Sequence, residues 1–133
     1  MVDIVQYDPI EAVVVAYLQA ALAGRGDTAT VATKVHNPRP NRFVKVTAAG
    51  GAETALVLTD RTVIFECWDL TEPAAAFLAE RSFAIMRASM RDHSEPRIRS
   101  VKVVGLPVSF PDPDTTLPRY QFTLSLTLRG FSA

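Results

Sequence analysis

The last regular stretch of the chain, residues 120–129 with the sequence YQFTLSLTLR, limits the possible folds more than any other feature. Large apolar residues alternate with polar ones, which is the pattern of a β-strand with one buried face and one polar face. Such a strand is typical of an antiparallel sheet that is covered on one side only. Its apolar face comprises Tyr120, Phe122, Leu124, Leu126 and Leu128.

Two segments predict helices that would cover this face. Residues 10–22 repeat apolar side chains at the spacing i, i+3, i+4 and i+7. Asp8 is the expected N-cap of this helix, with Pro9 in its first turn and Glu11 completing a capping box. A second helix is expected to start after Thr71 as N-cap, and the small and apolar residues between 75 and 90 suit packing against a sheet.

Further stretches with β-prone residues predict strands at 30–36, 42–49, 61–69 and 97–110. Gly50 and Gly51 predict a turn that leads into residues 53–60, which read equally as strand or loop. Gly105 and Pro107 indicate a bend or an edge position in the stretch 97–110. The expected fold is therefore α+β, in the order α-β-β-β-α-β-β. Residues 1–133 would form a single domain, a mostly antiparallel β-sheet with two α-helices packed on it.

Charge and hydropathy exclude several classes of protein. The chain has 14 basic and 14 acidic residues and a formal net charge of zero, whereas proteins that grip nucleic acid by charge usually show a basic excess. A local basic patch remains compatible with this total. The apolar runs are far shorter than a bilayer span, and an acid, Asp3, replaces the basic region of a signal peptide, so we expect neither a membrane segment nor an export signal.

The residue pattern also gives no sign of catalysis or metal binding. No nucleophile motif, phosphate-binding loop or metal-binding motif occurs. The single cysteine, Cys67, reads as a buried strand residue, and His36 and His93 read as surface or strand-end residues. The sequence PDPD at 111–114 reads as a turn. We therefore expect no catalytic residues, no cofactor, no metal and no enzyme activity.

Arginines gather near the expected strand ends and have two interpretations. Arg39 and Arg42 flank a turn, Arg97 and Arg99 open one strand, and Arg119 opens the last. A basic rim that contacts phosphates would form if several of them met at one end of the sheet, and solvated strand ends are the alternative. Trp68, at the end of a strand, fits either a core or an interface, because tryptophan is enriched in both.

Several stretches, in this order over nearly the whole chain, resemble the tail terminator proteins of long-tailed (siphovirus-type) bacteriophages, especially those that infect actinobacteria. They are an early helix opened by DP, HNPRPNRFVKV, the GG pair, VIFECWD leading into PAAAFLAERSFAIM, and GLPVSFPDPDTTLPRYQFTLSLTLRG. The last stretch is the most specific, with its PDP and PRYQ lead-in to a strand that ends in RG. None of these stretches is an active-site signature.

The resemblance implies a structural virion protein of the tail and neck, assembled in the host cytoplasm. Such a protein caps the tail tube, terminates its polymerisation and forms the docking surface for the head. It acts as a ring of copies of itself, expected to be a hexamer, with DNA passing through without sequence-specific binding. Its other partners would be the tail tube protein and the head–tail connector or stopper protein. Candidate positions at the subunit interface or lumen are Arg39, Arg42, Gly50, Gly51, Trp68, Arg119, Tyr120, Gln121 and Arg129.

Three other functions stay open at this point. The first is a different neck component, such as a head-completion or stopper protein, or a tail tube subunit, which would stack into long polymers. The second is an enzyme, which would need a cleft with convergent polar groups. The third is a non-viral binding module, which a persistent monomer at high concentration would favour.

Overall fold

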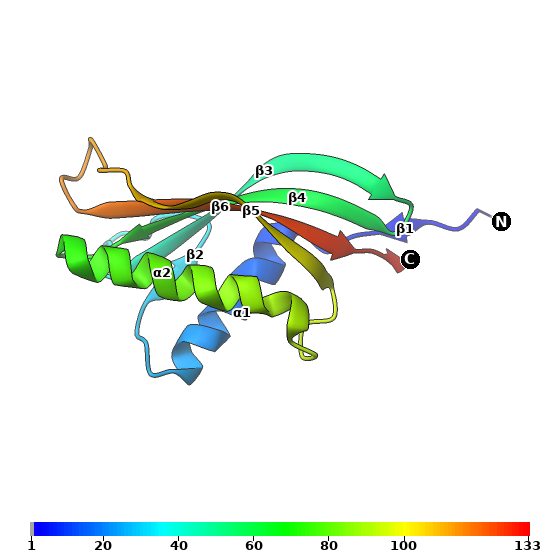
Figure 1. Ribbon diagram of the computed structural model, residues 1–133, viewed down its shortest axis with the longest axis horizontal. Helices are drawn as coiled ribbons and strands as arrows, with labels where there is room; N and C mark the ends of the chain where they lie inside the picture. The colour runs from blue at the N-terminus through cyan, green and yellow to red at the C-terminus, as the bar shows by residue number, and fades with distance from the viewer. Residues whose placement is uncertain (1) are drawn as a thin grey trace.

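The computed structural model describes residues 2–133, and these form the predicted α+β fold as a single compact domain. The helices and strands follow the predicted order, and two short strands are added near the chain ends (Figure 1). In chain order the elements are β1 (Val5–Gln6), α1 (Ile10–Gly24), β2 (Thr30–Ala32), β3 (Phe43–Ala55), β4 (Leu58–Trp68), α2 (Glu72–Ala88), a 3₁₀ turn η1 (Ser89–Arg91), β5 (Ile98–Ser109), β6 (Arg119–Arg129) and β7 (Phe131–Ser132).

The main sheet has the strand order β2-β3-β4-β6-β5. Its pairs are antiparallel, except that β2 joins β3 in parallel. Both helices lie against the same face of this sheet, and the opposite face carries no helix in the described chain (Figure 1). Strands β1 and β7 form a separate antiparallel pair that brings the two chain ends together.

The alternation of β6 defines the buried face as predicted. Phe122, Leu124, Leu126 and Leu128 are buried, while Tyr120 is half-buried. The same face of β4 buries Val63, Phe65 and Cys67, as its sequence predicts. The rings of Phe65 and Phe122 stack with centroids 4.5 Å apart, and each buried phenylalanine stabilises the fold by roughly 1.5–3 kcal/mol.

Strand β6 is central rather than peripheral. It pairs with β4 over its whole length and with β5 on its other side. The last long strand therefore offers no backbone edge to a neighbouring molecule. The long edge strand is β5, in which register shifts occur around Gly105 and Pro107, in agreement with the predicted bend and edge position.

The two helices bury the predicted faces, but only one of the predicted caps forms. Thr71 accepts a hydrogen bond from the amide of Ala74 at 3.3 Å and caps α2. The predicted cap of α1 is wrong, because Pro9 occupies the N-cap position without a side-chain bond. Asp8 instead accepts a bond from Arg97 at 3.0 Å, and Glu11 accepts one from the amide of Ala48 at 3.1 Å.

Two strand predictions are corrected by the backbone. The predicted strand 30–36 is confined to β2, since the bends that follow lead into a stretch with two prolines. The predicted turn at Gly50 and Gly51 is wrong, because β3 continues through both glycines as a bulge and the chain turns at residues 56–57. Residues 53–60, which the sequence left open, form the end of β3, this turn and the start of β4.

Candidate functional site

The predicted interface and lumen positions divide between the two ends of the main sheet. One end is formed by the last residues of β4 and the first of β6 and holds Arg39, Arg42, Trp68, Arg119, Tyr120 and Gln121. The other end is formed by the β3–β4 hairpin and the chain termini and holds Gly50, Gly51 and Arg129. The predicted positions therefore form two separate groups.

Trp68 is packed within the chain at its end of the sheet. Its side chain is on the face opposite to the helices, yet only 2% of the residue is exposed. The guanidinium of Arg39 lies 4.5 Å from the ring centroid, and the ring of Phe43 lies 5.6 Å away. The indole Nε1 donates a hydrogen bond to Asp112 at 3.2 Å. Trp68 thereby holds the segments around residues 39 and 112 against the sheet.

Arg119 fixes the proline-rich segment that precedes β6. It forms an ion pair with Glu66 at 2.8 Å, and its Nε donates to the carbonyl of Phe110 at 2.8 Å. Its guanidinium also lies 4.9 Å from the Phe110 ring. These contacts join both ends of the segment 111–118, so the lead-in to β6 is held on both sides.

Arg42 is the centre of an ion cluster between the helices and the sheet. It donates two hydrogen bonds to Asp27, at 2.8 and 2.7 Å, and one to Asp69 at 2.7 Å. Arg81 on α2 adds a bond to Asp27 at 3.0 Å. The bonds from Arg42 hold the pKa of Asp27 well below its usual range and raise the pKa of Arg42. The Asp27 side chain is only 2% exposed. The sequence RGD at residues 25–27, which has the composition of a cell-adhesion tripeptide, therefore does not present its aspartate to a partner.

Four of the five arginines predicted to form a basic rim make contacts within the chain. Arg42, Arg97 and Arg119 form ion pairs, Arg97 with Glu95 and Asp8. Arg39 is stacked on Trp68. Arg99 is exposed, but it lies near the opposite end of the sheet. Arg39, Arg42, Arg97 and Arg119 therefore brace other segments of the chain, Arg99 does not, and the rim predicted at one sheet end does not form.

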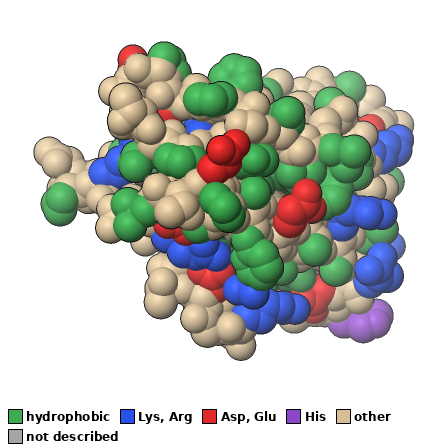
Figure 2. Space-filling view, turned by 60° about the vertical axis from the view of Figure 1, so that its left-hand side comes forward, with side chains coloured by type: hydrophobic (Ala, Val, Ile, Leu, Met, Phe, Trp, Pro, Cys, Tyr) green, Lys and Arg blue, Asp and Glu red, His purple; other side chains and the backbone are tan. Residues whose placement is uncertain are grey.

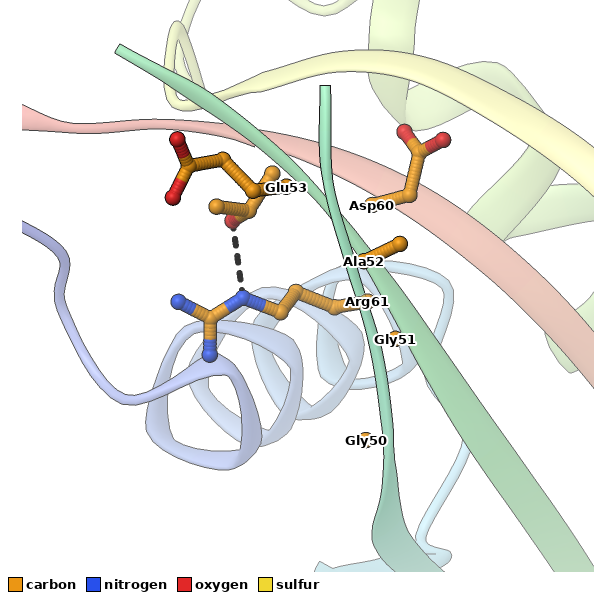
Figure 3. Close-up of a pocket in the computed structure, with 7 residues that line it drawn as sticks. Gly50, Gly51, Ala52, Glu53, Asp60 and Arg61 are labelled. Carbon is orange, nitrogen blue, oxygen red and sulfur yellow. Dashed lines mark hydrogen bonds between the residues drawn. The ribbon is translucent and has the colours of Figure 1, made fainter. Parts of the chain in front are cut away.

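Gly50 and Gly51 shape the outer part of β3. Their φ angles are +85° and +143°, in the range that favours glycine. A Cβ on Gly51 would lie 1.9 Å from the carbonyl oxygen of Asp60, so this position excludes any side chain. The bulge borders a shallow pocket, in which the Arg61 Nε donates to Thr59 Oγ1 at 2.8 Å and Asp60 points away from the guanidinium (Figure 3).

Tyr120, Gln121 and Arg129 belong to the central strand β6. Tyr120 is half-buried and its hydroxyl lies 3.5 Å from Glu72. Gln121 is on the polar face, between Glu66 on β4 and Val108 on β5. The side chain of Arg129 is exposed. The outer face of β6 is therefore accessible to a partner through side chains, while its backbone is occupied by the flanking strands.

One exposed apolar feature is on β5 and was missed by the sequence analysis. Five side chains on or next to this edge strand are between 42% and 65% exposed, and we name them the β5 rim. Figure 2 shows exposed hydrophobic side chains at many places on one face of the molecule, interspersed with charged ones. The signal in the sequence was the run VVGLPV, which is apolar without alternation. The β5 rim consists of Val103, Val104, Leu106, Val108 and Phe110.

A second apolar group lies where the chain ends meet the β3–β4 hairpin. Three segments converge there, held by backbone bonds from Gly130 to Val57 and from Ala133 to Ile4, both at 2.8 Å. The Tyr7 hydroxyl also donates to the carbonyl of Leu56 at 3.0 Å. The exposed apolar residues of this group are Val2, Ile4, Leu56, Val57 and Phe131.

Within residues 2–133, no group of three or more His, Cys, Asp or Glu side chains is placed to hold a metal ion. Over the same residues, no helix is both long enough and apolar enough to cross a bilayer. Cys67 is buried in β4 as predicted, and burial raises the pKa of its thiol well above the ordinary range.

Comparison of the chain with models of protein families and with curated protein sequences found no match.

Proposed function

We propose that the protein is a structural component of a siphovirus-type phage tail, the terminator that caps the tail tube and ends its polymerisation. In this role it forms a ring of identical subunits in the virion, with DNA passing through its centre, and presents a docking surface to the head–tail connector or stopper protein. It has no enzymatic role. The resemblance of the sequence over nearly its whole length supports this proposal.

The observation that carries the proposal is the β5 rim. Exposed apolar side chains that gather on one strand indicate a protein–protein contact. Those of the β5 rim flank both faces of the edge strand, since Val103 pairs with Leu124 and Val108 pairs with Gln121. The rim lies on an edge strand that has no further strand beside it among residues 2–133. A ring needs a heterologous contact between two different patches of each subunit, and the rim is one such patch.

The irregular backbone of β5 supports a closed assembly over an open one. Its pairing with β6 shifts register three times, and Pro107 lacks an amide hydrogen to donate. Bulges and proline on an edge strand limit continuous strand addition. A contact through apolar side chains at fixed positions suits a ring that closes, whereas a tube subunit must keep adding copies.

The test is the mass of the purified protein by light scattering over a concentration series, with negative-stain imaging of the same samples. Closed rings of one size are expected, and they should bind the end of tubes formed by purified tube protein. Filaments would identify a tube subunit instead. A monomer that stays monomeric even with tube protein present would refute the proposal.

A pair of substitutions assigns the contact to the β5 rim. Leu106 on the rim is 65% exposed, and Leu70 between β4 and α2 is 59% exposed. Leu106→Lys should weaken self-association at least tenfold, while Leu70→Lys should leave it unchanged. Equal effects of the two variants would show that the rim is not the contact surface.

A further inference from the structure

Four arginines surround the C-terminal end of α2, on a surface distinct from the β5 rim. Arg91 borders three neighbouring hollows. Arg25 shares the first of them, Arg99 the second and Arg87 the third. All four side chains are exposed. His93 lines two of the same hollows. Figure 2 shows basic side chains and a histidine along one edge of the molecule.

These four arginines differ from those at the other end of the sheet because none of them has a carboxylate partner within residues 2–133. Arg25 donates to the carbonyl of Ala21 at 3.1 Å, and the guanidinium of Arg87 lies 5.6 Å from the ring of Phe83. Neither contact neutralises charge. The guanidinium groups are therefore available to an anionic partner.

Few acidic groups offset this charge. Asp92 is charged and held by a bond from Ser94 Oγ at 2.7 Å and one from Tyr17 Oη at 2.8 Å. Glu95 is buried and already paired with Arg97. Glu80 lines the third hollow. The C-terminal ends of α1 and α2 each add about half a negative charge. The positive charge of the four guanidinium groups exceeds the negative charge of Asp92, Glu80 and the two helix ends. The net charge of this surface is therefore positive.

The zero net charge of the chain is therefore compatible with a locally cationic surface. Three acidic side chains that form no ion pair in the described chain lie at the opposite end of α2, where Glu72 opens the helix and Asp112 and Asp114 occupy the neighbouring loop, whereas Glu80 and Asp92 lie beside the arginines. Of these, Asp112 also accepts the bond from Trp68. A local cluster of cationic side chains attracts a polyanion even when the net charge of the protein is zero.

The arrangement of the arginines indicates what kind of anion fits. Arg25 directly follows α1, Arg87 and Arg91 belong to α2 and η1, and Arg99 belongs to β5, so the cationic surface extends over several elements. A small anion would engage one or two guanidinium groups, whereas a polymer with closely spaced charges engages all of them. Duplex DNA carries one charge per 1.7 Å of axis, roughly, and the planar guanidinium fits phosphate oxygens bidentately.

We propose that the surface formed by Arg25, Arg87, Arg91 and Arg99 binds the phosphate backbone of duplex DNA without sequence specificity. The proposed function supplies the DNA, since a tail ring encloses the DNA path, and in that setting this surface faces the lumen. The contact itself does not need a ring and is measurable on the protein in any oligomeric state.

The expected strength follows from counterion release. Four phosphate contacts give a slope of log K against log salt of about −3.6, so affinity falls roughly 150-fold between 50 and 200 mM salt. Binding would thus be readily measured at low salt and weak near physiological salt. Weak, salt-sensitive binding lets a duplex slide past the surface.

The test is fluorescence anisotropy with a labelled 20-base-pair duplex of arbitrary sequence, over a series of salt concentrations. The variant Arg87→Glu/Arg91→Glu should lose at least tenfold in affinity at 50 mM salt and lower the slope by about 2. Lys34→Glu/Lys45→Glu carries the same change of charge on residues elsewhere, Lys34 exposed and Lys45 half-buried on β3, and it should bind as the wild type does. Thermal melting confirms that each variant is folded, and Arg91→Gln/Arg99→Gln provides a milder second pair.

Three results would overturn the assignment: no binding by the wild type at 50 mM salt, equal losses in the two Glu variants, or equally strong competition by poly-glutamate. The last would identify an acidic polypeptide as the partner. These results concern only the DNA contact. The proposed function fails separately, if the protein neither forms rings nor caps tubes.

Discussion

Replacement of Asp27 by asparagine tests whether the ion cluster beneath the sheet is a main support of the fold. The carboxylate is 2% exposed and accepts three bonds from Arg42 and Arg81 and one from the amide of Ala29. Removing one member of a buried ion pair costs about 3–5 kcal/mol, because the partner charge stays buried. The Arg42 and Arg81 side chains are 23% and 32% exposed, so water offsets part of this cost.

We therefore expect Asp27→Asn to lower the free energy of unfolding by about 2–4 kcal/mol at pH 7. For a chain of 133 residues this corresponds to a fall in Tm of roughly 7–14 °C. The assay is urea denaturation followed by circular dichroism. Asp114→Asn is the matched control, because Asp114 is an exposed turn residue, and its effect should stay within about 0.5 kcal/mol.

The pH dependence gives an independent check. The bonds from Arg42 depress the pKa of Asp27 in the folded state, so the stabilisation is fully present above the unfolded pKa of about 4 and is lost as the pH falls toward the folded pKa. At pH 3 the advantage of the wild type over Asp27→Asn should shrink by about 1.3 kcal/mol, because the unfolded carboxyl is already mostly protonated. A loss like that of the control at pH 7, or an advantage that does not narrow at pH 3, would refute this account.

Three further predictions concern single positions. Gly51→Ala should destabilise the fold by about 2–4 kcal/mol in urea denaturation, since its Cβ would strike the carbonyl of Asp60, while Gly50→Ala has open space and should cost about 1–2 kcal/mol from its φ alone. Cys67 should not react with Ellman's reagent until denaturant is added, because burial shields the thiol and raises its pKa; rapid labelling of native protein would contradict this. Thr71→Ala should lower stability by about 0.5–1 kcal/mol and Thr71→Ser should restore it, a comparison that fails if both variants melt alike.

The sequence predicted those features of the fold that depend on local periodicity. The alternation of Phe122, Leu124 and their neighbours predicted which face of β6 is covered. The spacing of the small and apolar residues between 75 and 90 predicted which side of α2 packs on that face. Thr71 was identified as a cap because its bonding partner is three residues away. In each case the residues that decide the structure are close together in the chain.

The errors arose where distant residues compete with local signals. Asp8 has the local position of a helix cap, but Arg97, 89 residues later, binds its carboxylate instead. The glycine pair has the composition of a turn, yet β4 pairs with β3 on both sides of it and makes it a bulge. Periodicity contains no information about such partners.

The candidate site was less predictable than the fold for the same reason. Trp68 and Arg119 were singled out by residue type, but neither their mutual contact nor the pairing of Arg119 with Glu66 follows from spacing. Gly105 and Pro107 indicated a bend or an edge position, but the exposed residues of the β5 rim were not identified, because an unbroken apolar run is equally typical of a buried strand. Whether such a strand is central or at the edge depends on the order of strands in the sheet. Because β6 lies between β4 and β5, β5 is at the edge and its apolar side chains stay exposed.

The central position of β6 also determines the order in which the strands of the main sheet can pair during folding. During synthesis, β4 and α2 emerge well before β6. Val63 on β4 can pair with its cross-strand neighbour Leu124 only after a further 61 residues have been made. Contacts of such separation slow folding, since a long loop must close before they form. Strand β5 is joined to the sheet through β6 alone in the described chain, so the β5 rim takes shape after β6 is in place. An incomplete chain therefore lacks the β5 rim, which is the surface that the proposed function assigns to contact between subunits.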